Sequence, residues 1–131
     1  MKKRFSVIFV FFLLINSLFF AQNSASAANR NTALRCLRLA ENCLVGGDWE
    51  NAYRQAELGL SYDDSISDLI YVKAASASNL SYTRRETLDI IREAFKKDNW
   101  LGYSQNGARI LYADLLCDAG DYEISLELLD S

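Results

Sequence analysis

An internal repeat restricts the fold of this chain more than any other feature of the sequence. Each copy has a small residue, a Gly-Asp-aromatic triplet, a second small residue and then a small or apolar residue. The two clear copies are Ala40-x6-Gly47-Asp48-Trp49-x2-Ala52-x3-Ala56 and Ala113-x6-Gly120-Asp121-Tyr122-x2-Ser125-x3-Leu129. A pattern of this length is not expected to occur twice by chance. It indicates stacked pairs of helices, which present surfaces rather than catalytic groups.

The spacing has a direct physical interpretation. The first small residue allows a second helix to approach closely. Glycine accepts a left-handed conformation that ends the first helix, and the aspartate can cap the next one. We expect the aromatic residue after the turn to wedge between the two helices. The second small residue then gives the partner helix its point of contact.

A third and weaker copy lies between the other two. Ala75 is followed by Thr87, with the same separation as Ala40 and Ala52. The matching residues Ala40, Ala75 and Ala113 are 35 and 38 positions apart. The Gly-Asp-aromatic triplet is missing here, but the segment Thr83-Arg84-Arg85-Glu86 predicts a capping box that begins a helix.

Residues 31–131 together resemble the tetratricopeptide repeat (TPR), whose period is about 34 residues. The proline that usually follows the second helix is absent, because the chain contains no proline. The resemblance implies an all-α fold: a short α-solenoid of about three tandem antiparallel helix–turn–helix hairpins. We expect a cap within Ser65-Ile66-Ser67-Asp68. The expected helices cover residues 31–45, 48–61, 65–80, 83–97, 104–118 and 121–130.

The first 27 residues have the layout of a secretory signal peptide. Met1-Lys2-Lys3-Arg4 is basic, Phe5 to Phe20 is almost entirely apolar, and Ala25 and Ala27 form an A-x-A site. We expect cleavage after Ala27, which leaves residues 28–131 as the repeat domain. An uncleaved membrane anchor is the alternative. In both cases the repeats lie outside the cytoplasm, and the protein is periplasmic or secreted, as expected for a bacterial exported protein.

Removal of this segment makes the chain acidic. Loss of Lys2, Lys3 and Arg4 lowers the basic residues from 14 to 11 against 17 acidic ones, a net charge of −6. Nucleic-acid binding needs a basic surface, so it is not expected. The short clusters Arg84-Arg85 and Lys96-Lys97 are interpreted as solvated helix faces.

The sequence offers little for catalysis or for metal binding. It has no histidine, no Gly-rich phosphate loop and no C-x-x-C motif. Cys36 and Cys43 are seven positions apart on one expected helix, roughly 10 Å, and Cys117 lies roughly 20 Å away. We therefore expect three free thiols, no cofactor, no metal and no enzymatic activity.

The resemblance implies an exported scaffold for protein–protein interaction. In this family the first helices of successive hairpins line a concave groove that binds a peptide or helix. The corresponding residues here are Leu34, Leu37, Glu41, Val45, Leu69, Val72, Ser76, Leu80, Ile110, Asp114 and Asp118. This surface is apolar at its start and acidic at its end, which suits an amphipathic or apolar segment with some basic residues. Simple packing of the apolar members within the fold is the alternative.

The last expected helix carries Leu126, Leu128 and Leu129, which no further helix covers. We expect homodimers through this helix about a two-fold axis. Two other functions remain open. The chain is either a truncated fragment of a larger secreted repeat protein without independent activity, or a carrier of a small apolar ligand.

Overall fold

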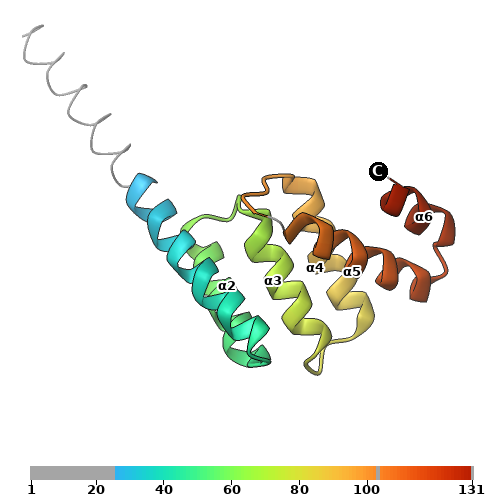
Figure 1. Ribbon diagram of the computed structural model, residues 1–131, viewed down its shortest axis with the longest axis horizontal. Helices are drawn as coiled ribbons and strands as arrows, with labels where there is room; N and C mark the ends of the chain where they lie inside the picture. Colours follow the sequence, from blue (N-terminus) through green and yellow to red (C-terminus); the bar gives the residue numbers. More distant parts are fainter. Residues whose placement is uncertain (1–25, 103, 131) are drawn as a thin grey trace, which may run out of the picture.

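The computed structural model describes residues 26–102 and 104–130, and this part of the chain is all-α, without strands. An N-terminal helix covers residues 26–45 of the described part. Five helices follow it in chain order: α2 (Trp49–Tyr62), α3 (Ser67–Ser78), α4 (Arg84–Lys97), α5 (Ser104–Ala119) and α6 (Tyr122–Asp130). Each successive pair packs side by side (Figure 1).

Contacts between helix ends show that the chain reverses within the first two helix pairs. Arg30, near the start of the N-terminal helix, reaches Asp63 just after the end of α2. The hydroxyl of Ser67, the first residue of α3, donates to the carbonyl of Ala94 near the end of α4. Both pairs are therefore antiparallel, as expected from their short connections.

The repeated sequence pattern marks the closest helix contacts. Ala40 and Ala52 have no exposed surface, and Ala113 and Ser125 are almost completely buried. The Ser125 hydroxyl donates to the Ala113 carbonyl at 2.9 Å, which ties α6 to α5. The prediction is confirmed for the small residues of the two clear copies, whereas Ala75 of the weaker copy is only half-buried.

The turns follow the prediction as well. Gly47 and Gly120 have φ values of +75° and +87°, in the left-handed region that favours glycine. The Asp48 carboxylate accepts from the Asn51 N–H at the start of α2. Thr83 and Glu86 form both halves of a capping box at α4.

The core consists of two clusters that share α3. One joins the N-terminal helix, α2 and α3, and the other joins α3, α4 and α5. Because α3 packs against α2, α4 and α5 as well as the N-terminal helix, it is buried on several sides. Its buried apolar residues are Leu69, Ile70, Val72, Ala74 and Ala77.

A polar network holds the α4–α5 connection against the start of α3. The Asp68 carboxylate, only 1% exposed, accepts from the Leu101 N–H at 2.7 Å and from the Ser104 hydroxyl. The Asn99 N–H donates to the Ser67 hydroxyl at 2.9 Å, and the Ser67 N–H donates to the Asn99 carbonyl at 3.0 Å. The bonds from Leu101 and Ser104 satisfy the Asp68 carboxylate, whose burial without partners would be energetically costly.

Several local expectations were wrong. The N-terminal helix is already formed at residue 26 rather than 31, and α3 is shorter than expected at both ends, so Leu80 lies outside it. Ser65 does not cap α3: Ile66 is the N-cap residue without a side-chain bond, and Ser65 instead donates to Asp63. Tyr122 is 63% exposed and does not wedge between helices.

The cysteines Cys36, Cys43 and Cys117 are all free, as expected. Most of the expected signal peptide, residues 1–25, lies outside the described residues. None of the described helices is both long and apolar enough to span a bilayer.

Candidate partner-binding surfaces

The expected concave groove is only partly available to a partner. Leu37, Leu69, Val72 and Ser76 are buried in the core, and the Ser76 hydroxyl donates to the Val72 carbonyl of its own helix. For these four residues the groove prediction is wrong. The reason is that the neighbouring helices pack over α3 and over the inner side of the N-terminal helix, so that residues at groove positions fill the interior instead.

The remaining groove residues have side chains that solvent reaches. Leu34, Glu41 and Leu80 are half-buried, whereas Val45 is exposed. Burial raises the pKa of Glu41, and the negative charge of Asp68 adds to this. Glu41 therefore lies in a partly desolvated, acidic environment.

An exposed row runs along α5. It consists of Asn106, Ile110, Asp114, Cys117 and Asp118, which follow one another at helical spacing. Ile110 is 65% exposed, in the middle of otherwise polar positions. This row, which we call the α5 face, contains the predicted groove residues Ile110, Asp114 and Asp118. It presents one apolar anchor with carboxylates one and two turns further on.

A cleft between α4 and α5 was not predicted from the sequence. Its volume is about 370 Å³, and it is lined by Arg84, Arg85, Leu88, Arg92, Leu115, Asp118, Ala119 and Asp121. We call it the arginine cleft. A smaller hollow of about 200 Å³ shares Arg84 and Leu115 with it. The hydrophobic parts of the arginine side chains extend its apolar lining.

The three arginines of this cleft differ in their bonding. Arg84 forms ion pairs with Asp114 and Asp118 and so links α4 to α5. Arg92 pairs with Asp89 on its own helix at 3.3 Å. For Arg85, the described residues supply no hydrogen bond or ion pair. Arg84 and Arg85 are both exposed, as expected for a solvated face, and Arg84 in addition bridges two helices. The sequence did contain a signal for this cleft. The spacing of three and four places Arg85, Leu88 and Arg92 on one side of a helix, which therefore combines basic and apolar residues.

The last helix exposes an apolar row. Tyr122, Leu126 and Leu129 are 63%, 64% and 53% exposed, and their spacing of four and three places them on one side of α6. Leu128, by contrast, is half-buried against the second core cluster. The expectation of exposed leucines at this end is confirmed for Leu126 and Leu129 and is only partly met for Leu128.

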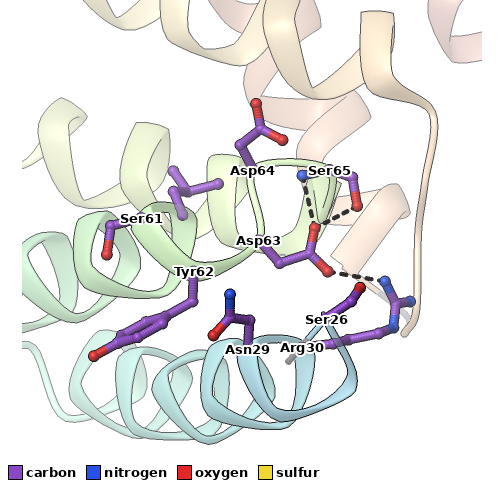
Figure 2. A pocket seen from close by; sticks show the side chains of 9 residues that line it. Ser26, Asn29, Arg30, Ser61, Tyr62, Asp63, Asp64 and Ser65 are labelled. Atoms are coloured by element: carbon purple, nitrogen blue, oxygen red, sulfur yellow. Dashed lines mark hydrogen bonds and ion pairs between the residues drawn. The ribbon is translucent and has the colours of Figure 1, made fainter. Parts of the chain in front are cut away.

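A larger pocket lies where the start of the N-terminal helix meets the α2–α3 turn (Figure 2). Its volume is about 790 Å³, and its lining is mostly serine, asparagine, arginine and aspartate side chains. Figure 2 shows Asp63 at its centre, bonded to Arg30 at 3.0 Å and to the Ser65 hydroxyl at 2.6 Å. The hydrogen bond from Ser65 is the main cause that lowers the pKa of Asp63. A lining of this polarity does not favour a carrier of apolar ligands.

The described residues hold no group of histidine, cysteine or acidic side chains arranged for a metal ion.

Comparisons with known proteins give limited information. No family model and no solved structure matches the chain. A protein of Treponema pallidum (strain Nichols), described as an uncharacterized protein, is 32% identical over 92 residues. These residues make up 70% of this chain and 12% of the relative, so the chain spans a small part of that protein's length.

Proposed function

We propose that this protein is an exported interaction module, built as a short TPR-like α-solenoid, that binds a segment of another protein. The recurring small residues at helix contacts and the two left-handed glycine turns support the solenoid assignment. Repeats of this kind use extended surfaces for binding rather than a single deep site.

The observation that carries the proposal is the α5 face. Ile110 is an isoleucine left 65% exposed on a helix whose opposite side is well packed. An exposed apolar residue beside carboxylates can serve as an anchor for an amphipathic segment with basic residues. Asp114 and Asp118 form ion pairs with Arg84, so a basic residue of the partner would compete with Arg84 for these carboxylates.

Site-specific photo-crosslinking in the native host tests this proposal. A photoreactive phenylalanine analogue at position 110 should give a discrete adduct with one envelope protein, identified by mass spectrometry. The same analogue at Arg54, an exposed residue of α2, is the matched control. Ile110→Asp should abolish the partner's co-purification. Equal adduct patterns from positions 110 and 54 would refute the proposal.

The proposed location outside the cytoplasm rests on the n-region, apolar run and A-x-A site of residues 1–27. Intact-mass measurement of the protein made by the host should show Ala28 as the first residue. A retained Met1 in the membrane fraction would instead identify an uncleaved anchor.

A second candidate is that the chain represents part of a larger repeat protein. The observation that favours it is the much longer Treponema relative, of which the matching segment is 12%. In such a protein the apolar row of α6 would pack against the next hairpin. Sequencing of the transcript and detection of a longer in-frame product would support this candidate.

A further inference from the structure

The exposed side of α6 has a distinct chemistry. Besides the apolar row of Tyr122, Leu126 and Leu129, the helix carries Glu123, Glu127 and Asp130 and no basic residue. Ile124, on another side of the helix, is also 53% exposed. The apolar row of this acidic helix lacks a cover among the described residues. Any surface that covers it must be apolar at the centre and basic at the rim.

The arginine cleft has the complementary character. Leu88, Leu115 and Ala119 contribute apolar surface, and three arginines of α4 line the cleft together with Asp118 and Asp121. Arg84 is neutralised by Asp114 and Asp118, which leaves Arg85 and Arg92 as the groups available to a carboxylate. To bind such a carboxylate, Arg92 would give up its 3.3 Å ion pair with Asp89. That pair is exposed and therefore contributes little to stability.

We propose that α6 of one copy docks on the arginine cleft of a second copy. This interface goes beyond the proposed function and uses a different surface from the α5 face. Direct α6–α6 pairing, in contrast, would bring the carboxylates of Glu123 and Glu127 against those of the second copy. Repulsion between like charges disfavours that arrangement.

The arrangement also allows a closed dimer. Asp121, which directly precedes α6, lines the arginine cleft, so the donating helix and the accepting cleft are neighbours on the same chain. Two copies related by a two-fold axis can therefore exchange α6 contacts reciprocally, so that each interface is present twice. Because the contacts are partly ionic and exposed, added salt should weaken the dimer.

Charge reversal provides a sharp test by sedimentation velocity on the protein in the form that the host produces. One variant carries Arg85→Glu with Arg92→Glu, and the other carries Glu123→Lys with Glu127→Lys. The dimer dissociation constant of each variant alone should be at least about tenfold higher than that of wild type, because its cleft and its α6 then have the same charge. An equimolar mixture of the two should restore dimers, since each α6 then meets a cleft of opposite charge.

The matched control is Arg54→Glu with Lys96→Glu, which changes the net charge equally at exposed sites away from the cleft. It should leave the dimer unchanged, and circular dichroism should show the same helix content in all variants. A strictly monomeric wild type at high micromolar concentration would overturn the proposal. Dimers unaffected by Arg85→Glu with Arg92→Glu would do the same. Neither result bears on crosslinking from position 110, so the two proposals can fail separately.

Discussion

Gly59 lies at a close contact between α2, α3 and the N-terminal helix. A Cβ atom at this position would lie 2.7 Å from Leu69 Cδ2 and 3.1 Å from Cys36 Cβ. Leu69 is fully buried, so its side chain has little space to move away. The absence of a side chain at residue 59 therefore allows the helices to approach as closely as they do.

Gly59→Ala should destabilise the fold, although alanine normally favours a helix by about 1 kcal/mol over glycine. Overpacking of a filled core typically costs about 1–3 kcal/mol, which we expect to exceed that gain here. Chemical denaturation measures the difference. Gly102→Ala is the control, because a Cβ there would meet only Asp68 Oδ1 at an ordinary 3.5 Å. A Gly59→Ala protein more stable than wild type would show that the contact is not tight.

The start of α4 depends on a reciprocal cap. The Thr83 hydroxyl accepts from the Glu86 N–H at 3.2 Å, and the Glu86 carboxylate accepts from the Thr83 N–H at 2.8 Å. The Thr83 backbone bond, followed by the Thr83 hydroxyl, holds the pKa of Glu86 below its ordinary value of 4.5. This middle repeat lacks the glycine turn of the others, and the cap provides its helix start instead.

The cap gives a prediction for pH dependence. Because the pKa of Glu86 is lower in the folded state, its carboxylate contributes fully to folding stability above its pKa in the unfolded chain. This contribution is lost as the pH falls through the folded pKa. The hydrogen bond from Ser65 lowers the pKa of Asp63 and adds a loss in the same direction. Thermal melting of Glu86→Gln should show a smaller loss on acidification below about pH 4.5 than wild type.

Glu93→Gln, on the exposed side of the same helix, is the control for that measurement. It should leave the slope of stability against pH close to that of wild type. An unchanged slope in Glu86→Gln would mean that the cap carboxylate does not contribute in solution.

The connection between α4 and α5 is held by Asp68 rather than by apolar contacts alone. Asp68→Ala would leave the Leu101 N–H and the Ser104 hydroxyl without their acceptor. Hydrogen bonds to a charged group contribute about 1.5–3 kcal/mol, so unfolding should occur at clearly lower denaturant concentration. Asp89→Ala, an exposed aspartate of α4, should change the midpoint little. Equal midpoints for both variants would contradict this role of Asp68.

The whole molecule is unevenly supported along its length. Helix α3 packs against α2, α4 and α5, whereas among the labelled helices α6 packs only against α5. Figure 1 shows α6 at one end of the molecule, beside α5. Local opening requires the loss of fewer contacts at α6 than at α3.

Hydrogen exchange should therefore be fastest in α6 and slowest in α3. The measurement is amide exchange followed by mass spectrometry at low protein concentration, where association does not protect α6. A rise in α6 protection with concentration, which Arg85→Glu with Arg92→Glu removes, would agree with the proposed dimer. Protection of α6 equal to that of α3 in the monomer would contradict the expected order.

The chain's pattern of small and apolar residues was sufficient to predict an all-α fold, six helix positions and the turns at Gly47 and Gly120. These features depend on local spacing, because a glycine turn and a helical period are set by residues close in sequence. The capping box at Thr83 was predictable for the same reason. The side-chain cap expected within Ser65-Ile66-Ser67-Asp68 was wrong, because the N-cap residue is Ile66 and the Ser65 hydroxyl donates to Asp63 instead.

The surfaces were decided by tertiary packing. Whether Leu69 and Val72 lined a groove or filled the core depended on how many helices surrounded α3, which no local pattern specifies. The arginine cleft likewise exists only because α5 lies against α4 and Arg84 reaches Asp114 and Asp118 across that contact. Residues distant in sequence meet there, and their meeting depends on the summed packing of the helices between them.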